Sequence, residues 1–157
     1  MASKLQEKLN ANPEKLQKYN TLKQAFTNNT FIKRADLTEL KALSSPPRLV
    51  QQTLSALLLL TNLASPEAPD GKPEVEWRIV KKLLCDANFL RTISNGIDEK
   101  IENLDKETVE LVGQYVNDEK CSLEHVRKVS AAASNVCEYV RVGYEFGEFC
   151  FREVNEL

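Results

Sequence analysis

One pair of side chains in this sequence has the spacing of a nucleophile and its base. Cys121 and His125 lie four residues apart, so on a helix they would share a face, and an imidazole can withdraw a thiol proton. The same stretch also suits a helix start, because Ser122 is a favoured N-cap residue. We therefore expect a helix cap with a solvent-facing imidazole and no enzyme activity in this chain, with a Cys–His enzyme as the alternative.

The other chemistry-bearing residues match no cofactor or metal motif. The four cysteines, at positions 85, 121, 137 and 150, fit no zinc spacing, and one histidine cannot complete such a site. The sequence also contains no glycine-rich phosphate loop and no metalloprotease motif. We expect four free thiols in a reducing compartment, no metal and no cofactor.

Composition and charge restrict the class of protein further. The chain has 157 residues, 42% apolar and 28% charged, which suits one helix-rich domain with an extended arm. No apolar run approaches a membrane span, and the N-terminus lacks a signal peptide core, so no membrane association is expected. Whether residues 1–12 are ordered is left open.

The net charge of −2 is distributed unevenly along the chain. Residues 1–45 carry +4, residues 46–135 carry −3 and residues 136–157 carry −3. The two ends therefore attract each other weakly, which favours their lying side by side. An acidic centre argues against nucleic acid as a partner, although a local basic patch can still face an acidic protein.

The N-terminal third has the pattern of a coiled-coil strand. A helix is predicted to begin at Pro13, because Asn12 is a favoured cap and proline suits the first helical position. Apolar residues then follow a heptad that is interrupted by Thr30 and Lys33. The apolar positions of this seam are Leu16, Tyr19, Phe26, Leu37 and Leu40.

Pro46 and Pro47 are expected to form a hinge between this strand and a compact bundle. Pro46 disfavours helix before it, whereas Pro47 fits the first turn of a new helix, whose broad apolar face should lie in a core. A loop at 65–73 follows. Further helical segments are predicted from Trp77, from about 86 to 95, within 97–104 and over 105–116.

The last helix is predicted to run unbroken from Ser122 to about residue 155. It carries a heptad seam and, beside it, a second stripe at sevenfold spacing, so two registers look nearly equivalent. Gly143 and Gly147 are expected to soften it. The seam comprises Val126, Val129, Ala133, Val136, Val140 and Gly143; the second stripe comprises Ser130, Cys137, Tyr144 and Phe151.

These patterns predict an all-α fold, a small bundle of about six helices at the tip of an antiparallel two-helix coiled coil. The expected parts are an N-terminal stalk strand at 1–45, a globular head at 46–135 and a C-terminal stalk strand at 136–157, continuous with the last helix. The strands must be antiparallel because the head joins them at one end.

Three stretches in order resemble the stalk tip of dynein heavy chains. They are LTELK (Leu37–Lys41) followed by the proline pair, EWRIVKKLLCDANFL (Glu76–Leu90) and EHVRKVSAAASNVCEYV (Glu124–Val140), within about 33–146. The resemblance implies a non-catalytic microtubule-binding head whose partners are the microtubule and the rest of the heavy chain, with an axonemal light chain left open. The ATPase ring of such a motor lies outside this chain.

The resemblance also implies which residues contact the microtubule and where the protein works. Family members commonly have Lys where this chain has Gln51, and some have a basic residue at Asp86. Cytoplasmic members tend to have proline near Asn135, so the sequence favours a cytoskeletal location in the cytoplasm, in the axoneme of a cilium or flagellum. The implied contact residues are Arg48, Gln51, Lys81, Lys82, Glu124, Arg127 and Lys128.

The seam and the second stripe of the last helix offer two nearly equivalent registers for its partner strand. We therefore expect affinity for the microtubule to depend on the register of the two stalk strands. The alternative function is a helical scaffold or adaptor that binds partner helices through an apolar groove. Binding to acidic tubulin should weaken steeply with salt, whereas binding in an apolar groove should not.

Overall fold

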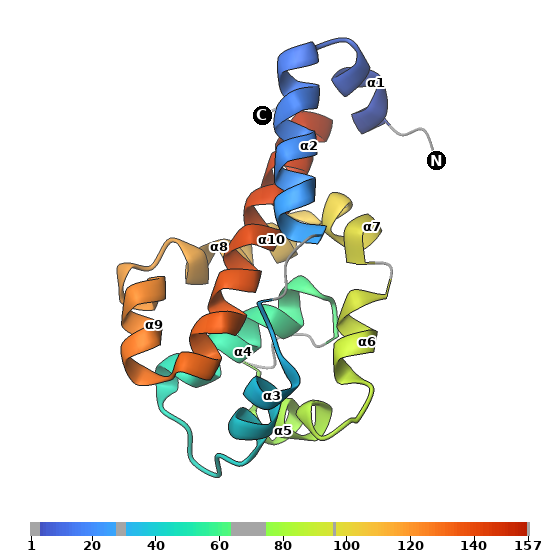
Figure 1. Ribbon diagram of the computed structural model, residues 1–157. Helices are drawn as coiled ribbons and strands as arrows, with labels where there is room; N and C mark the ends of the chain where they lie inside the picture. Colours follow the sequence, from blue (N-terminus) through green and yellow to red (C-terminus); the bar gives the residue numbers. More distant parts are fainter. Residues whose placement is uncertain (1–3, 28–30, 64–74, 96, 157) are drawn as a thin grey trace.

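The computed structural model describes residues 4–27, 31–63, 75–95 and 97–156, and these residues form an all-α protein without strands (Figure 1). The predicted fold class is therefore confirmed. No helix in these ranges is long and apolar enough to cross a membrane. The helices are α1 (Lys4–Asn10), α2 (Pro13–Thr27), α3 (Arg34–Lys41), α4 (Arg48–Leu60), α5 (Trp77–Leu84), α6 (Phe89–Ser94), α7 (Ile97–Glu102), α8 (Lys106–Val116), α9 (Leu123–Val129) and α10 (Ala131–Asn155), with a 3₁₀ turn η1 at Glu119–Cys121.

The apolar helix after the prolines is the centre of the head, as its composition predicts. Pro47 lies at the N-cap of α4, where its missing N–H removes no hydrogen bond. From Thr53 onward every residue of α4 is buried, and the helix packs against α5, α8, α9 and α10. The predicted loop at 65–73 lies outside the described residues.

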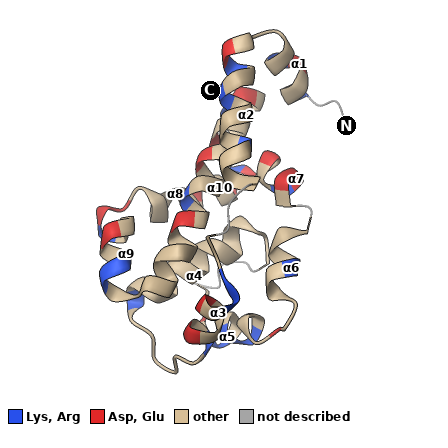
Figure 2. Cartoon of the chain, in the orientation of Figure 1, with Lys and Arg blue, Asp and Glu red and all other residues tan. Residues whose placement is uncertain are grey.

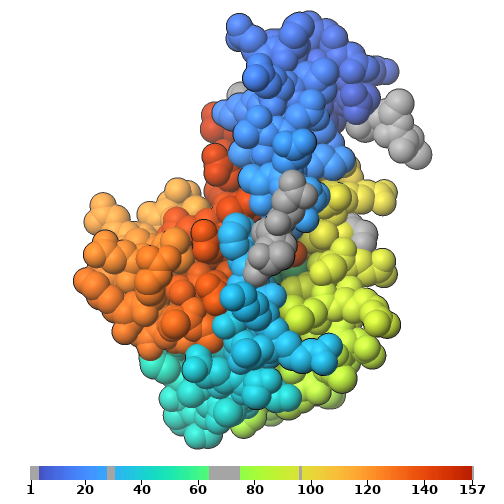
Figure 3. All heavy atoms as spheres, in the orientation of Figure 1, coloured from blue at the N-terminus to red at the C-terminus, as the bar shows by residue number. Residues whose placement is uncertain are grey.

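The two arms pair antiparallel above the head, with both termini at the same end (Figures 1 and 3). Aromatic residues fill the contact between α2 and α10: the ring centroids of Tyr19 and Phe146 are 5.6 Å apart, and those of Phe26 and Tyr139 are 5.1 Å apart. Tyr19 and Phe26 are both buried, so the heptad position that they share is confirmed as the seam of this arm.

The N-terminal arm is not one helix, however. Helix α2 ends at Thr27 and α3 begins at Arg34, with residues 28–30 outside the described part of the chain. The Oδ2 of Asp36 accepts a hydrogen bond from the backbone N–H of Lys33 at 2.9 Å, which satisfies a free donor at the start of α3. Lys33, one of the two polar residues that interrupt the heptad, is thus the N-cap residue of α3.

The last helix is also divided, which corrects the prediction of an unbroken helix from Ser122. Ser130 has an extended backbone, and its hydroxyl accepts from the N–H of Ala133 at 3.1 Å, so it ends α9 and caps α10. Serine can replace a helical hydrogen bond in this way, and the heptad count does not detect it. As a result Val129, predicted to lie in the seam, is 46% exposed.

The second stripe of the last helix is used by the head. Tyr144 packs against α8, where its hydroxyl would lie 2.9 Å from a Cβ added to Gly113, and Cys137 is buried beside the carbonyl of Cys121. The seam residue Gly143 instead faces Phe26 and Leu60. The two stripes therefore have different partners and are not interchangeable along this part of α10.

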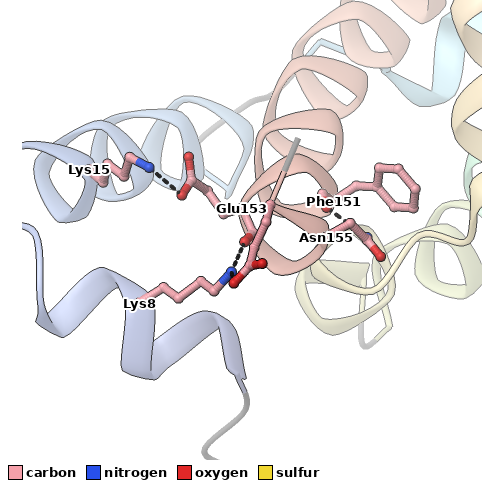
Figure 4. Close-up of polar contacts among 6 residues, drawn as sticks. Lys8, Lys15, Phe151, Glu153 and Asn155 are labelled. Carbon is pink, nitrogen blue, oxygen red and sulfur yellow. Dashed lines mark hydrogen bonds and ion pairs between the residues drawn. The ribbon is translucent and has the colours of Figure 1, made fainter.

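Residues 4–10 form a helix that folds back on the ends of the arms, whereas residues 1–3 lie outside the described part. Leu5 and Leu9 are buried, and α1 packs against both α2 and α10. The ammonium of Lys8 donates to the carbonyl of Glu153 at 2.9 Å, near the C-terminal end of α10 (Figure 4). A cation at this end interacts favourably with the helix dipole.

The close approach at Gly143 predicts the sign of a stability change. A Cβ at this position would lie 2.9 Å from Leu60 Cδ2 and 2.9 Å from Phe26 Cε1, both on fully buried side chains. Helix propensity alone favours Ala over Gly by about 1 kcal/mol, but overpacking costs about 1–3 kcal/mol. We expect Gly143→Ala to lower the free energy of unfolding by about 1 kcal/mol, measured by urea denaturation.

The matched control is Glu145→Ala, at an exposed position two residues further along the same helix. We expect it to change the free energy of unfolding by less than about 0.5 kcal/mol. A Gly143→Ala variant that is more stable than the parent protein would contradict the close packing described for this position.

Candidate functional site

Helix α9 presents its charged residues to solvent at the side of the head (Figure 2). Ser122 caps the helix by accepting from the N–H of His125 at 3.2 Å, and the buried Val126 anchors it to the core. Arg127 and Lys128 follow in the last turn, where the helix dipole favours cations. The charged face of α9 is thus fixed in place by its cap and its one buried residue.

The three predicted contact residues on α9 do not neutralise one another fully. Lys128 Nζ lies 3.8 Å from Glu124 Oε1 in an i,i+4 pair, but the two side chains are 72% and 79% exposed. Such exposed pairs contribute only about 0.3–0.5 kcal/mol and leave the charges accessible. Within the described residues Arg127 has no ion-pair partner, so its guanidinium is available for an external acidic group.

Arg48 lies close to α9, because it begins α4 and α4 packs against α9. Its charge also acts on the thiol of Cys121 in the turn before α9: burial raises the pKa of Cys121 to about 11, and the charges of Arg141 and Arg48 oppose that rise. Arg48 therefore lies near the turn that leads into α9, the helix that carries Arg127 and Lys128 in its last turn.

Gln51 contacts the proline pair that precedes α4. It is half-buried, and its side-chain amide donates to the carbonyl of Pro46 at 3.0 Å. Pro46 itself is buried, and Trp77 Nε1 donates to the carbonyl of Leu43 at 3.1 Å, just before the proline pair. The connection between α3 and α4 is therefore held by side chains of both α4 and α5.

Lys81 and Lys82 lie apart from the basic group of α4 and α9. They are in the last turn of α5, which packs against α3 and α4 through Val80 and Leu84. Lys81 is half-buried and Lys82 is exposed. Figure 1 shows α5 at the end of the head away from the paired arms, whereas α9 lies along one side of the head.

Two residues that the sequence analysis did not select connect this region to α10. Arg141 donates from Nη2 to the carbonyl of Cys121 at 2.6 Å and from Nη1 to that of Val116 at 3.2 Å, so it fixes the chain just before α9. Asn135 donates to Asp36 Oδ2 at 3.0 Å and joins α10 to α3. For Arg141 the sequence did contain a signal, because a charged residue interrupts the apolar heptad of the last helix there.

The Cys–His pair considered as a nucleophile and base is not formed. Cys121 is buried, and the pKa of about 11 that burial gives its thiol disfavours the reactive thiolate at neutral pH. His125 is exposed, and its Nδ1 lies 2.6 Å from the hydroxyl of Ser122. In the described residues no three His, Cys, Asp or Glu side chains gather in a way that could hold a metal ion.

The sequence is similar to parts of several dynein heavy chains. Over 114 residues, 73% of this chain, the sequence is 32% identical to the dynein-1-beta heavy chain of the flagellar inner arm I1 complex of Chlamydomonas reinhardtii. Over 108 residues, 69% of this chain, it is 31% identical to human dynein axonemal heavy chain 6. Each match covers 2% of the relative's own length, so this chain spans a small fraction of these relatives.

The relatives also bear on the choice between cytoplasmic and axonemal members. Over 69% of this chain, the sequence is 30% identical to the ciliary dynein beta chain of Heliocidaris crassispina, which is named, like the other two, for a cilium, flagellum or axoneme. The expectation of an axonemal type of sequence is thereby confirmed. The family model described as the microtubule-binding stalk of dynein motor matches residues 1–155, so the chain belongs to this family of dynein stalks.

Proposed function

We propose that this chain is a non-catalytic head that binds microtubules at the end of a dynein stalk. The observation that carries the proposal is that exposed basic residues stand at the start of α4 (Arg48) and in the last turn of α9 (Arg127 and Lys128), two helices that pack against each other. Tubulin offers an acidic surface, and complementary charge steers and orients such an encounter. The family to which the chain belongs supports the same role.

Each of the implied contact residues has a place in this proposal. Arg127 and Lys128 bind acidic groups directly, and Glu124 holds Lys128 in position through their i,i+4 pair. Lys82 and, less directly, the half-buried Lys81 form a second point of contact on α5. Gln51 acts through the hinge, because its amide is bonded to Pro46.

The register of the arms sets the affinity in this proposal. Helix α2 is linked through α3 and the Pro46–Pro47 hinge to α4, and α10 follows α9 after a break at Ser130. Displacement of α2 along α10 would shift α4 relative to α9 and so rearrange Arg48 against Arg127. The coupling is reciprocal, so binding to the microtubule must bias the register by the same free energy.

The proposed location and partners follow from the relatives. The chain would work in the axoneme of a cilium or flagellum as part of a dynein heavy chain, whose ATP hydrolysis takes place elsewhere in that protein. An axonemal light chain is a further candidate partner.

The scaffold alternative requires an accessible apolar face that could receive a partner helix. The apolar helix α4 does not provide it, because its apolar residues from Val50 to Leu60 are covered by neighbouring helices, with Leu59 only 5% exposed. Among the described residues the exposed large hydrophobic side chain is Val129, beside the basic residues of α9. A partner on that face would therefore meet charge as well as apolar surface.

Reversal of charge on α9 should remove binding. We expect Arg127→Glu/Lys128→Glu to weaken binding to polymerised microtubules at least about tenfold, because two side chains at an interface each contribute about 1 kcal/mol. Binding of the parent chain should also weaken steeply as salt increases. Co-sedimentation at low and moderate salt measures both effects.

A matched control is Lys100→Glu/Lys106→Glu, which changes the net charge equally. Lys100 and Lys106 are exposed on α7 and α8, on the side of the head toward the arms (Figure 1). Microtubule binding should be nearly unchanged in this variant. Equal loss in both double variants would mean that net charge, and not the face formed by α4 and α9, controls binding.

Cysteine pairs across the arms test the dependence on register. A pair at Phe26 and Gly143 joins residues in contact and holds the present register, whereas a pair at Leu22 and Gly143 requires α2 to move one turn toward the head. With the exposed Cys85 replaced by Ser, we expect the two oxidised proteins to differ in microtubule affinity by about fivefold or more. Equal affinities would rule out control by register, and reduction of the disulfides should abolish the difference.

A further inference from the structure

Helix α9 is short, and the chain leaves helical geometry on both sides of it. It spans the seven residues Leu123–Val129, between the cap at Ser122 and the break at Ser130. An isolated helix of this length is not stable in water, because its first turn fixes several residues for one hydrogen bond. Its buried residue is Val126, so few apolar contacts hold it on α10 and α4. The position of α9 therefore depends on how the adjoining segments are held.

The segment before α9 is fastened to α10 by Arg141. Its Nη1 donates to the carbonyl of Val116, the last residue of α8, at 3.2 Å, and its Nη2 donates to that of Cys121, the last residue of η1, at 2.6 Å. Carbonyls at the C-terminal end of a helix lack partners within the helix, and the dipole there favours a cation. One guanidinium thus binds two helix ends, on either side of residues 117–120.

Both ends of α9 are thereby tied to α10, beside whose first half it lies (Figure 1). At its C-terminal end the chain passes directly into α10 through Ser130, whose backbone is extended. At its N-terminal end Arg141, about 15 Å along α10 from Ala131, holds Cys121, the residue before the cap. Without the second tie, α9 would be attached through Ser130 alone and could turn about it.

The surroundings of Arg141 show that the two carbonyls account for its presence. The residue is half-buried, and its Nε is buried without a hydrogen-bond partner. Within the described part of the chain no carboxylate forms an ion pair with it. An apolar side chain of similar size would fill such a position at lower cost, since burial of a charged group is unfavourable unless its protons are bonded. The arginine is therefore explained by the helix ends that it binds.

The segment that Arg141 holds also meets α4. The Sγ of Cys121 lies 3.9 Å from Oε1 of Gln52, one turn after the start of α4. Burial raises the pKa of the Cys121 thiol to about 11, and the charges of Arg141 and Arg48 both oppose this rise. Arg141 therefore fixes the start of α9 relative to α4 as well as to α10.

We propose that Arg141 is a positioning residue for microtubule binding, which holds the start of α9 so that the basic residues of this helix stand at a fixed position relative to α4. The proposal rests on the proposed function, because it concerns the same contact helix. Arg141 acts through α9 and does not touch the microtubule. If α9 could turn about Ser130, only a fraction of the molecules would have the binding arrangement, and the apparent affinity would fall by that fraction.

Distance measurement between two spin labels tests the position of α9 in the full chain. The labels are placed at His125, exposed on α9, and at Arg152, exposed on α10, in a Cys85→Ser background. Arg152 is about 17 Å along α10 from Arg141, so the measured distance depends on the direction in which α9 points. The other three cysteines are buried and react slowly with the label.

We expect one narrow distance in the parent protein and a distribution at least about twice as broad in Arg141→Met, because the methionine cannot bind the two carbonyls. Arg141→Lys should be intermediate, since a lysine keeps the charge but cannot hold both carbonyls in a planar fork. Saturating microtubules should narrow the Arg141→Met distribution again, because they select one position. In co-sedimentation without labels, Arg141→Met should bind microtubules about threefold more weakly or worse, with Arg141→Lys between it and the parent.

Two controls separate positioning from other effects of the substitution. Lys100→Met removes the same charge at an exposed position on α7 and should match the parent protein in both measurements. The affinity of Arg141→Met should keep the salt dependence of the parent protein, because Arg127 and Lys128 are intact. Circular dichroism and urea denaturation confirm that each variant folds. If Arg141→Met does not fold, Arg141→Lys decides by the same two measurements.

Three results would overturn the proposal. The first is a parental distance distribution in Arg141→Met, and the second is a broadened distribution with unchanged microtubule affinity. The third is a flatter salt dependence in Arg141→Met, which would mean that Arg141 itself contacts the microtubule. A parent chain that does not pellet with microtubules would reject the proposed function, whereas a broadened distribution in Arg141→Met would still support the anchoring of α9, so the two failures are distinguishable.

Discussion

The structure depends on one helix, α10, whose surface is shared between the head and the arm. Its first half is enclosed by α4, α8 and α9, and its second half pairs with α1 and α2. Gly143 lies where the two environments meet, in contact with Phe26 of the arm and Leu60 of the head. Closely packed interfaces change between discrete arrangements more readily than they deform, and this shared contact is why we propose that a shift of the arm against α10 would alter the packing of the head.

Polar contacts are concentrated where separate segments must keep their alignment. The hydrogen bond from Asn135 to Asp36 joins α10 to α3, and the ion pair of Lys23 with Glu102 joins α2 to α7. At the end of the arm remote from the head, Lys8 and Lys15 both contact Glu153. Apolar side chains supply most of the free energy of the arm contact but specify the alignment weakly, since one apolar residue can replace another. Hydrogen bonds and ion pairs penalise misalignment, because a partly buried group that loses its partner is costly.

The charge asymmetry along the sequence has two uses in the fold. The basic N-terminal arm lies against the acidic end of α10, where Lys8 pairs with Glu156 and Lys15 pairs with Glu153. The basic residues of the head are instead displayed on α9 and at the start of α4, although the head as a whole is acidic. Electrostatic attraction acts within about 8 Å at physiological salt, so the local group and not the net charge decides the partner.

The sequence by itself determined the helical class, the start of a new helix after the proline pair, the burial of that apolar helix and the antiparallel pairing, because periodicity and turn residues act over a few positions. It did not reveal that α2 ends at Thr27 and α3 begins only at Arg34, or that Ser130 separates α9 from α10, because a serine or aspartate side chain caps a helix only where the surrounding packing favours that hydrogen bond. Only the tertiary structure decided that Val129 is exposed, that Tyr144 of the second stripe packs on α8, and that α4, which begins at Arg48, packs against α9. These outcomes join residues far apart in the chain, and local pattern carries no information about which distant surfaces meet.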